Sequence, residues 1–223
     1  MKVRSFLLLA VLCLAPIAAH AGIIDVTVDT SALVGHPAGP FYLEFSLNDG
    51  SGSGDGNNTV IVDNFDFGGG SASGSSALLG GASGDLSSGV TLSDSFSFAD
   101  LVQAFTPGST LTFRVTTTNN VDPGTPDSFF FFILDSSQAW VPTLAPSFGN
   151  YFLTFNIDGD PPTLASYASD NSISPSAGGP PINIAAPQAS FGAAAVPEPG
   201  MALPLAAGFG MIAFFRKRGK VTK

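Results

Sequence analysis

The chain has 223 residues and a formal net charge of −9 at pH 7. All 17 acidic residues lie between Gly22 and Pro199, where Arg114 is the one basic residue. A segment with so little positive charge cannot neutralise phosphate groups, which excludes nucleic acid as a partner.

The first 21 residues have the features of a secretory signal peptide. A basic start, an apolar run and a small-x-small site follow one another: Lys2 and Arg4, Phe6 to Leu14, and Ala19-His20-Ala21. This order predicts a signal peptide over residues 1–21 that is cleaved before Gly22. The only cysteine, Cys13, is removed with it, so the mature chain has neither disulfides nor thiol chemistry.

Residues 22–170 are predicted to form a single all-β domain. Apolar and polar residues alternate with the period of two that is typical of half-buried strands, over 41–47, 111–115 and 151–157. The stretch "SFFFFILD" (128–135) is apolar on both faces and predicts a central, covered strand. Frequent Gly- and Pro-rich turns favour an antiparallel β-sandwich that is jelly-roll-like.

The alternation also predicts the environment of individual side chains. Four phenylalanines are expected in the core: Phe45, Phe113, Phe131 and Phe155. Arg114 falls on the polar face of its strand, where we expect an ion pair with one of the many aspartates. The stretch Ala99–Phe105 could form one helical turn.

Two stretches repeat a pattern in which an aspartate lies in register with apolar residues: Ile61-x-Asp63-x-Phe65-x-Phe67 and Leu92-x-Asp94-x-Phe96-x-Phe98. Three interpretations remain open. The strand bulges there, the aspartate caps a turn at the edge of the core, or the two carboxylates form a functional pair. The Gly- and Ser-rich residues 68–89 between them have the composition of a loop. A loop of that length inside a compact domain is either mobile or functional.

One glycine-rich turn has the spacing of a calcium-binding loop. Its oxygen-bearing side chains are Asp49, Ser51, Ser53, Asp55 and Asn57. The twelfth position is Val60 rather than a bidentate glutamate, and the flanks are strands, so a solvated hairpin loop is the alternative. Calcium is the one cofactor that the sequence raises, and no other metal site is predicted.

Other candidate residues are few. His36 stands beside a proline in a turn and is expected to be structural. Trp140, the sole tryptophan, is expected either to stack on a sugar or to lie in the core or at its rim. With so many acidic residues, a pair of carboxylates does not by itself indicate a glycosidase. The sequence has no His/Cys cluster, phosphate-binding loop or nucleophile elbow, so we do not expect an enzyme.

The composition changes beyond Asp170. Residues 171–196 carry no charge and are rich in Pro, Ala, Gly and Ser, which predicts a linker. Residues 197–223 then form a separate unit, which begins with Pro-Glu-Pro and continues with an apolar run, Met201 to Phe215. As a helix this 15-residue run spans about 22 Å, short of the ~30 Å hydrocarbon core.

The basic end of the chain follows this run directly and includes Arg216, Lys217 and Arg218. Basic residues beside an apolar run remain on the cytoplasmic side of a membrane. We therefore expect a short transmembrane helix that stops translocation and serves as a sorting signal rather than as a permanent anchor.

This tail resembles a known sorting signal. Val196-Pro197-Glu198-Pro199, an apolar run and a basic cluster, in that order, are similar to the PEP-CTERM signal of Gram-negative bacteria. The resemblance implies that an exosortase, a membrane-embedded cysteine protease, processes the chain near Pro-Glu-Pro. It also implies export to the cell surface or the extracellular matrix. The stretches "DNFDFGGG" and "PDSFFFFILD" resemble a group of uncharacterised exported proteins with this tail.

The sequence thus predicts an exported, non-catalytic protein of the cell surface or extracellular matrix. Its expected partners are the exosortase, the secretion machinery and extracellular polysaccharide, and its precursor is expected to lie transiently in the inner membrane. The alternative is a carbohydrate-binding module on the same β-sandwich. A lectin should show a groove with exposed aromatic residues, whereas an enzyme should show a cleft with coupled carboxylates of shifted pKa.

Overall fold

The computed structural model describes residues 22–118, 120, 124–146, 149–158 and 163–191, and all of the described strands lie in one compact unit, Ala19–Ala194. These residues form an all-β fold with one short 3-10 helix, η1 (Ser31–Leu33). Thirteen strands occur in them: β1 (Gly22–Asp29), β2 (Phe41–Asn48), β3 (Thr59–Asp66), β4 (Ser71–Ala72), β5 (Ala77–Gly80), β6 (Ala82–Asp85), β7 (Gly89–Ser93), β8 (Phe98–Thr106), β9 (Thr110–Thr117), β10 (Ser128–Leu134), β11 (Leu153–Asn156), β12 (Leu164–Ser166) and β13 (Gln188–Phe191).

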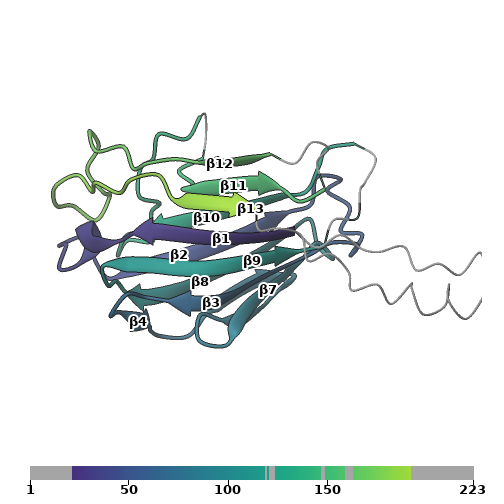
Figure 1. The fold of residues 1–223 in the computed structure, drawn as a ribbon, viewed down its shortest axis with the longest axis horizontal. Coiled ribbons are helices and arrows are strands. Elements are labelled where there is room, and N and C mark those ends of the chain that lie inside the picture. Colours follow the sequence, from purple (N-terminus) through teal and green to yellow (C-terminus); the bar gives the residue numbers. More distant parts are fainter. Residues whose placement is uncertain (1–21, 119, 121–123, 147–148, 159–162, 192–223) are drawn as a thin grey trace, which may run out of the picture. The chain divides into compact units, whose positions relative to one another are not determined.

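The strands form two antiparallel sheets, which Figure 1 shows as two stacked layers. Sheet A has the order β13-β1-β9-β3-β7-β6. Sheet B has the order β12-β11-β10-β2-β8-β4, and β5 also pairs with β8. The inner faces of both sheets contribute to one apolar core, so the fold is β-sandwich-like. The predicted all-β class is confirmed.

Phenylalanines from both sheets meet in this core. The four predicted core residues, Phe45, Phe113, Phe131 and Phe155, are at most 3% exposed, which confirms the prediction. Phe45 and Phe131 come from sheet B and Phe113 from sheet A, and their ring centroids lie 5.1–5.4 Å apart. Aromatic pairs at this distance contribute beyond the area that they bury, so this cluster joins the two sheets.

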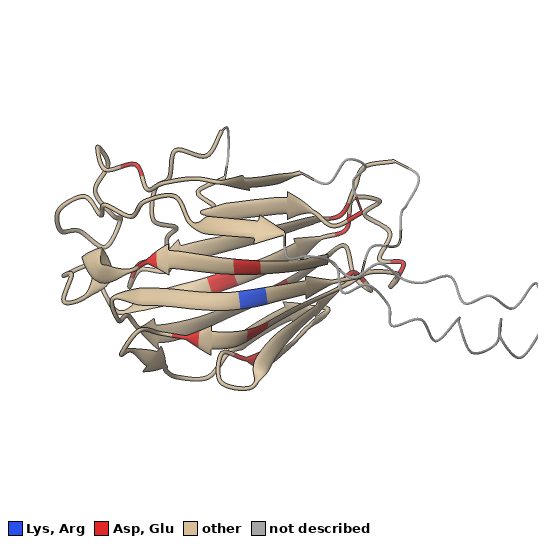
Figure 2. Ribbon diagram, viewed as in Figure 1, with Lys and Arg blue, Asp and Glu red and all other residues tan. Residues whose placement is uncertain are grey.

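The sole arginine of the described residues lies on the outer face of sheet A. Arg114 of β9 pairs in register with Asp25 of β1 on one side and with Asp63 of β3 on the other. Its Nε donates to Asp25 Oδ1 at 2.8 Å, so the predicted ion pair with an aspartate is confirmed. Figure 2 shows the one basic position with acidic positions on neighbouring strands.

Strand β3 contains a bulge at the first of the two aspartate repeats. Its register against β9 shifts between Asp63 and Asp66, and Asn64 takes a positive φ of 55°. A bulge reverses which face the following side chains occupy. Phe65 and Phe67 therefore pack against the core although the strand before them points its even-numbered residues inward.

The prediction of a long loop over 68–89 is wrong. Short strands β4 and β5 pair with β8, and β6 pairs with β7, so this segment extends the edges of both sheets. Strands can pair through backbone hydrogen bonds without an alternating pattern of side chains. Glycine also lets two backbones approach more closely than other residues allow. A Cβ on Gly80 would lie 2.0 Å from the Phe98 carbonyl oxygen. The suggested helical turn at Ala99–Phe105 is wrong too, because these residues lie inside β8.

The prediction of a linker is wrong for residues 171–191, and the folded unit does not end at Asp170. Strand β13 pairs with β1, and Ile182 and Ile184 are each 1% exposed in the core. The Ser169 hydroxyl donates to the Ile182 carbonyl oxygen at 2.8 Å and accepts from the Ile184 N–H at 2.7 Å. Two buried isoleucines and four strand residues thus hold a segment whose composition is that of a linker.

The sequence predictions for the two ends of the chain lie outside the described residues. They are the signal peptide with Ala19 and Ala21, residues 192–196, the motif Val196–Pro199, the run Met201–Phe215, and the basic end with Arg216, Lys217 and Arg218. Within the residues that the structure does describe, no helix has the length and apolar character needed to cross a membrane.

Two isoleucines of the 171–191 segment test its role. Ile184→Ala should lower the free energy of unfolding by about 2–5 kcal/mol, because it removes a buried side chain from the core. Ile173→Ala is the matched control: Ile173 is 51% exposed, so its truncation should change the free energy by less than about 0.5 kcal/mol. Urea unfolding curves measure both. Equal, small effects would show that the segment is not part of the core.

Candidate functional site

A groove of about 480 Å³ lies on the outer face of sheet B. Strands β2, β8 and β10 line it, together with residues that follow β10 in the chain. The lining residues are Glu44, Ser46, Asn48, Asp100, Phe130, Phe132, Trp140, Gly149 and Tyr151. The set combines four aromatic side chains with two carboxylates and contains no basic residue.

The alternation of strand β2 places its polar side chains in this groove. Odd-numbered residues of β2 are buried in the core, so Glu44, Ser46 and Asn48 face outward. Ser46 pairs in register with Asp100 of β8 on one side and with Phe130 of β10 on the other. The three neighbouring strands therefore carry a row of carboxylate, hydroxyl and aromatic groups across the sheet.

Trp140 is held at the groove by contacts with two of the strands below it. Its Nε1–H donates to Glu44 Oε2 at 2.8 Å. Its indole stacks on the Phe132 ring, with centroids 5.1 Å apart and an interplanar angle of 19°. The side chain is nevertheless 42% exposed. Phe132 thus supports one part of the indole, and the rest is open to a ligand.

The turn before Trp140 is fixed by hydrogen bonds. The Asp135 N–H donates to the Ala139 carbonyl oxygen at 2.9 Å, and the Val141 N–H donates to that of Ile133 at 2.8 Å. The buried Asp135 carboxylate accepts from the N–H and hydroxyl of Ser137. Trp140 is therefore presented by a short, hydrogen-bonded hairpin at the end of β10.

Tyr151 forms the other aromatic wall of the groove. Its ring centroid lies 5.2 Å from that of Phe130 and 5.5 Å from that of Tyr167. A Cβ on Gly149 would lie 2.1 Å from the Tyr151 ring, so only glycine allows the ring to lie against the backbone there. Burial, with a smaller contribution from Tyr167, raises the pKa of Tyr151.

The two carboxyl groups of the groove influence each other. Glu44 pairs with Val102, two residues beyond Asp100, so the two acids are diagonal neighbours on adjacent strands. Burial raises the pKa of Glu44; the Trp140 hydrogen bond opposes this rise and the Asp100 charge adds to it. Burial also raises the pKa of Asp100, against a hydrogen bond from Ser46.

Sequence reasoning identified Trp140 but missed both acids of the groove. Trp140 is 42% exposed at the rim, which was one of the positions considered for it, and its stacking on a sugar stays a prediction. A signal for Glu44 was present, because it stands on the polar side of an alternating strand. Asp100 could not be placed beside it, since the pairing of β2 with β8 joins residues more than fifty positions apart.

The suggested calcium loop is held together by its own hydrogen bonds. One Asp49 carboxylate oxygen accepts from the N–H groups of Ser51 (2.7 Å) and Gly52 (3.0 Å), and the other accepts from that of Gly54. The Ser51 and Ser53 hydroxyls bond to each other at 2.6 Å.

The second half of this loop follows the same pattern. Asp55 Oδ1 accepts from the Asn57 N–H at 3.2 Å. Backbone N–H groups thus donate to both carboxylate oxygens of Asp49 and to Asp55 Oδ1. Among the described residues, no group of three or more His, Cys, Asp or Glu side chains is placed to hold a metal ion.

Two buried aspartates lie beside this loop, where Figure 2 shows acidic positions gathered at one end of the sheets. Asp94 and Asp127 are 0% exposed. Both bond to Asn58: its backbone N–H donates to Asp94 Oδ2 at 2.8 Å and its Nδ2 to Asp127 Oδ2 at 3.0 Å. The repeat aspartate Asp94 thus lies in a turn beyond β7, as the capping interpretation expected, and not beside Asp63.

Asp94 is the more strongly shifted member of this pair. Burial raises the pKa of Asp94 to about 7; the Asn58 hydrogen bond opposes the rise, and the negative charges of Asp127 and Asp55 add to it. Burial also raises the pKa of Asp127. No described donor reaches Asp94 Oδ1, which is buried. The charge of one carboxylate thus disfavours ionisation of the other, which adds to the effect of burial.

His36 has a structural role, as expected. Its Nδ1 accepts from the Ala38 N–H at 3.1 Å, and its Nε2 lies 3.1 Å from the Pro180 carbonyl oxygen. With Nδ1 as acceptor, Nε2 carries the hydrogen and donates to Pro180. His36 therefore ties the turn after η1 to the 171–191 segment.

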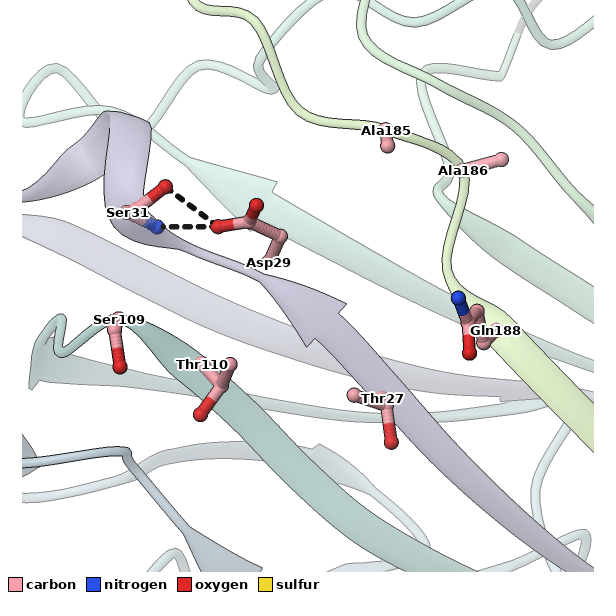
Figure 3. Close-up of a pocket in the computed structure, with 8 residues that line it drawn as sticks. All are labelled: Thr27, Asp29, Ser31, Ser109, Thr110, Ala185, Ala186 and Gln188. Atoms are coloured by element: carbon pink, nitrogen blue, oxygen red, sulfur yellow. Dashed lines mark hydrogen bonds between the residues drawn. The ribbon is translucent and has the colours of Figure 1, made fainter.

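A second hollow of about 390 Å³ lies on sheet A, where Figure 3 shows small side chains of β1, β9 and the segment before β13. Its one carboxylate, Asp29, accepts from the N–H and hydroxyl of Ser31 at 3.0 and 2.6 Å. These bonds lower the pKa of Asp29. No aromatic ring lines this hollow, so the groove on sheet B is the stronger candidate for a ligand site.

No family model matches the chain, and comparisons with curated proteins and with solved structures found no match either.

The Asp94 pair predicts an unusual pH dependence of stability. The ordinary pKa is 3.8 and the folded one about 7. Between these values the unfolded chain has released the Asp94 proton while the folded chain retains it, so stability falls as pH rises. Asp94→Asn stays neutral at every pH and should remove this part of the slope.

Thermal unfolding midpoints between pH 4 and pH 7 test this. The unfolding midpoint of Asp94→Asn should increase relative to that of wild type as the pH rises through this interval. Asp66→Asn is the matched control, since Asp66 is an exposed aspartate of β3, and it should follow wild type. A difference between the midpoints of wild type and Asp94→Asn that is constant with pH would contradict the raised pKa of Asp94.

Proposed function

We propose that this chain is the precursor of an exported, non-catalytic protein of the cell surface or extracellular matrix. Its β-sandwich-like unit binds polysaccharide through the groove on sheet B. The observation that carries the binding role is Trp140, whose partly exposed indole is fixed by Glu44 and Phe132. A fixed aromatic face beside hydrogen-bonding side chains suits a sugar ring, which has apolar faces and a polar edge.

The sorting role rests on the sequence. The signal peptide over residues 1–21, the Val196–Pro199 motif, the Met201–Phe215 run and the basic end with Arg216 to Arg218 support export through the inner membrane. The partners in this proposal are the secretion machinery and an exosortase. We also propose that Met201–Phe215 forms a short transmembrane helix in the precursor.

The strand order supports a jelly-roll type of sandwich. Strands β1, β2 and β3 pair with β9, β8 and β7 respectively. These pairs alternate between sheet A and sheet B, as in one long antiparallel ribbon that is rolled up. The extra strands β10, β11 and β12 widen sheet B beside the groove.

Hydrolysis of the polysaccharide is a second candidate, favoured by the Glu44–Asp100 pair. Diagonal neighbours on adjacent strands have Cβ atoms roughly 7 Å apart. Glycosidases place their two carboxyl groups about 5–9.5 Å apart, and one of them has a raised pKa. New reducing ends, formed by wild type and absent with Glu44→Gln, would establish this activity in place of simple binding.

Replacing Trp140 tests the binding role. Trp140→Ala should weaken binding to the polysaccharide of the producing cells by about 30-fold or more, since an interface tryptophan of this kind contributes at least ~2 kcal/mol. Leu144→Ala is the matched control, because Leu144 is 62% exposed and outside the groove. Co-sedimentation with the polysaccharide measures both. Equal binding by the two variants would remove Trp140 from the site.

Replacing Pro197-Glu198-Pro199 with alanines tests the sorting role. The apolar run and basic end would still stop translocation, so the variant should cross the inner membrane in part and accumulate as a membrane-bound precursor. Pro181→Ala, at an exposed proline upstream, should be released like wild type. Cell fractionation with intact-mass measurement follows both. Normal release of the triple variant would refute processing at this motif.

A further inference from the structure

The carboxylates of the groove have no positive partner in the described part of the chain. Glu44 and Asp100 are the two charged residues of the lining. The one described arginine, Arg114, is engaged with Asp25 on the other sheet, at 2.8 Å. The one described histidine, His36, is engaged in its turn with Ala38 and Pro180. Among the described residues, Glu44 and Asp100 are thus compensated by hydrogen bonds from Trp140 and Ser46, and no positive charge lies in the groove lining.

The electrostatics of the groove favour a ligand cation. Glu44 and Asp100 are diagonal neighbours, and each is partly removed from water. A negative charge there is destabilised by lost hydration and by its neighbour. A positive group placed between them offsets both costs, and a negative group would add a third like charge. An acidic polymer would therefore be disfavoured at these two carboxylates by like-charge repulsion.

The aromatic rings act in the same direction. Trp140 and Phe132 stack at 5.1 Å, and Tyr151 and Phe130 lie 5.2 Å apart on the same face of the sheet. The faces of aromatic rings attract cations, most strongly for tryptophan. The groove therefore provides stacking for an apolar ring face, charge-assisted acceptors for an ammonium group and a favourable potential for it.

We propose that the groove is selective for a saccharide polymer with free amino groups, a de-N-acetylated hexosamine polymer, over its neutral and acidic counterparts. In this arrangement the sugar ring stacks on Trp140 and an ammonium group lies at Glu44 and Asp100. This inference rests on the proposed binding of polysaccharide at the groove. It assigns to Glu44 and Asp100 the role of specificity-determining residues.

Calorimetric titration of the purified protein with three hexasaccharides tests the proposal: hexamers of glucosamine, N-acetylglucosamine and glucose. The glucosamine hexamer should bind at least about tenfold more tightly than the other two, because hydrogen bonds to charged groups are the stronger ones. Glu44→Gln and Asp100→Asn should each lower the ratio of the affinity for the glucosamine hexamer to the affinity for the glucose hexamer. Asp66→Asn, with the same charge change on sheet A, should keep it.

Each other outcome has a definite meaning. Equal affinities for the three hexamers would overturn the amine selectivity and leave polysaccharide binding in place, whereas no binding of any hexamer or of the cellular polysaccharide would overturn both. A preference for glucosamine that survives Glu44→Gln and Asp100→Asn would overturn the assignment to these acids. Polylysine that binds as tightly as the glucosamine hexamer, and through the same acids, would overturn the saccharide class. Thermal midpoints within a few degrees of wild type show that the variants are folded.

Discussion

The structure depends on one strand that carries large apolar side chains on both of its faces. Successive residues of a strand point to opposite sides, so β10 places Phe129 and Phe131 in the core and Phe130 and Phe132 on the outer face of sheet B. The inner pair joins the phenylalanine cluster between the sheets. The outer pair needs a cover of its own, which Trp140 and the ring of Tyr151 provide.

This cover is incomplete, and the groove results from it. Trp140 shields the Phe132 side chain, which is only 7% exposed. The Trp140 side chain itself remains 42% exposed. The polar face of β2 runs beside these rings and supplies the acceptor that fixes the indole, Glu44. Packing of the sheet and presentation of the aromatic face therefore rely on the same contacts. The buried acids Asp94, in the turn after β7, and Asp127, directly before β10, do not line this groove.

Local patterns in the sequence predicted the parts of the fold that depend on local order. The all-β class, the buried Phe45, Phe113, Phe131 and Phe155, and an aspartate partner for Arg114 all followed from period-two alternation. The strands between 68 and 89 and the docking of 171–191 did not follow. The glycine-rich strands between 68 and 89 pair through their backbones and show no side-chain alternation. Strand β13 pairs with β1, which is more than 150 residues away in the sequence, so no local pattern indicates this contact. The groove could be predicted only in part. Trp140 was identifiable as a candidate from its residue type. The proximity of Glu44 to Asp100 was not, because it depends on the register between strands that are far apart in the sequence.

The fluorescence of Trp140 reports whether this side chain is the platform on which a saccharide binds. The chain has one tryptophan, so its emission reports on the groove alone. Covering a partly exposed indole with a sugar ring should shift the emission to shorter wavelength, and the shift should saturate with the same dissociation constant as binding measured by co-sedimentation. Binding of the polysaccharide with no change in the emission of Trp140 would contradict the account, because the polymer would then occupy another surface.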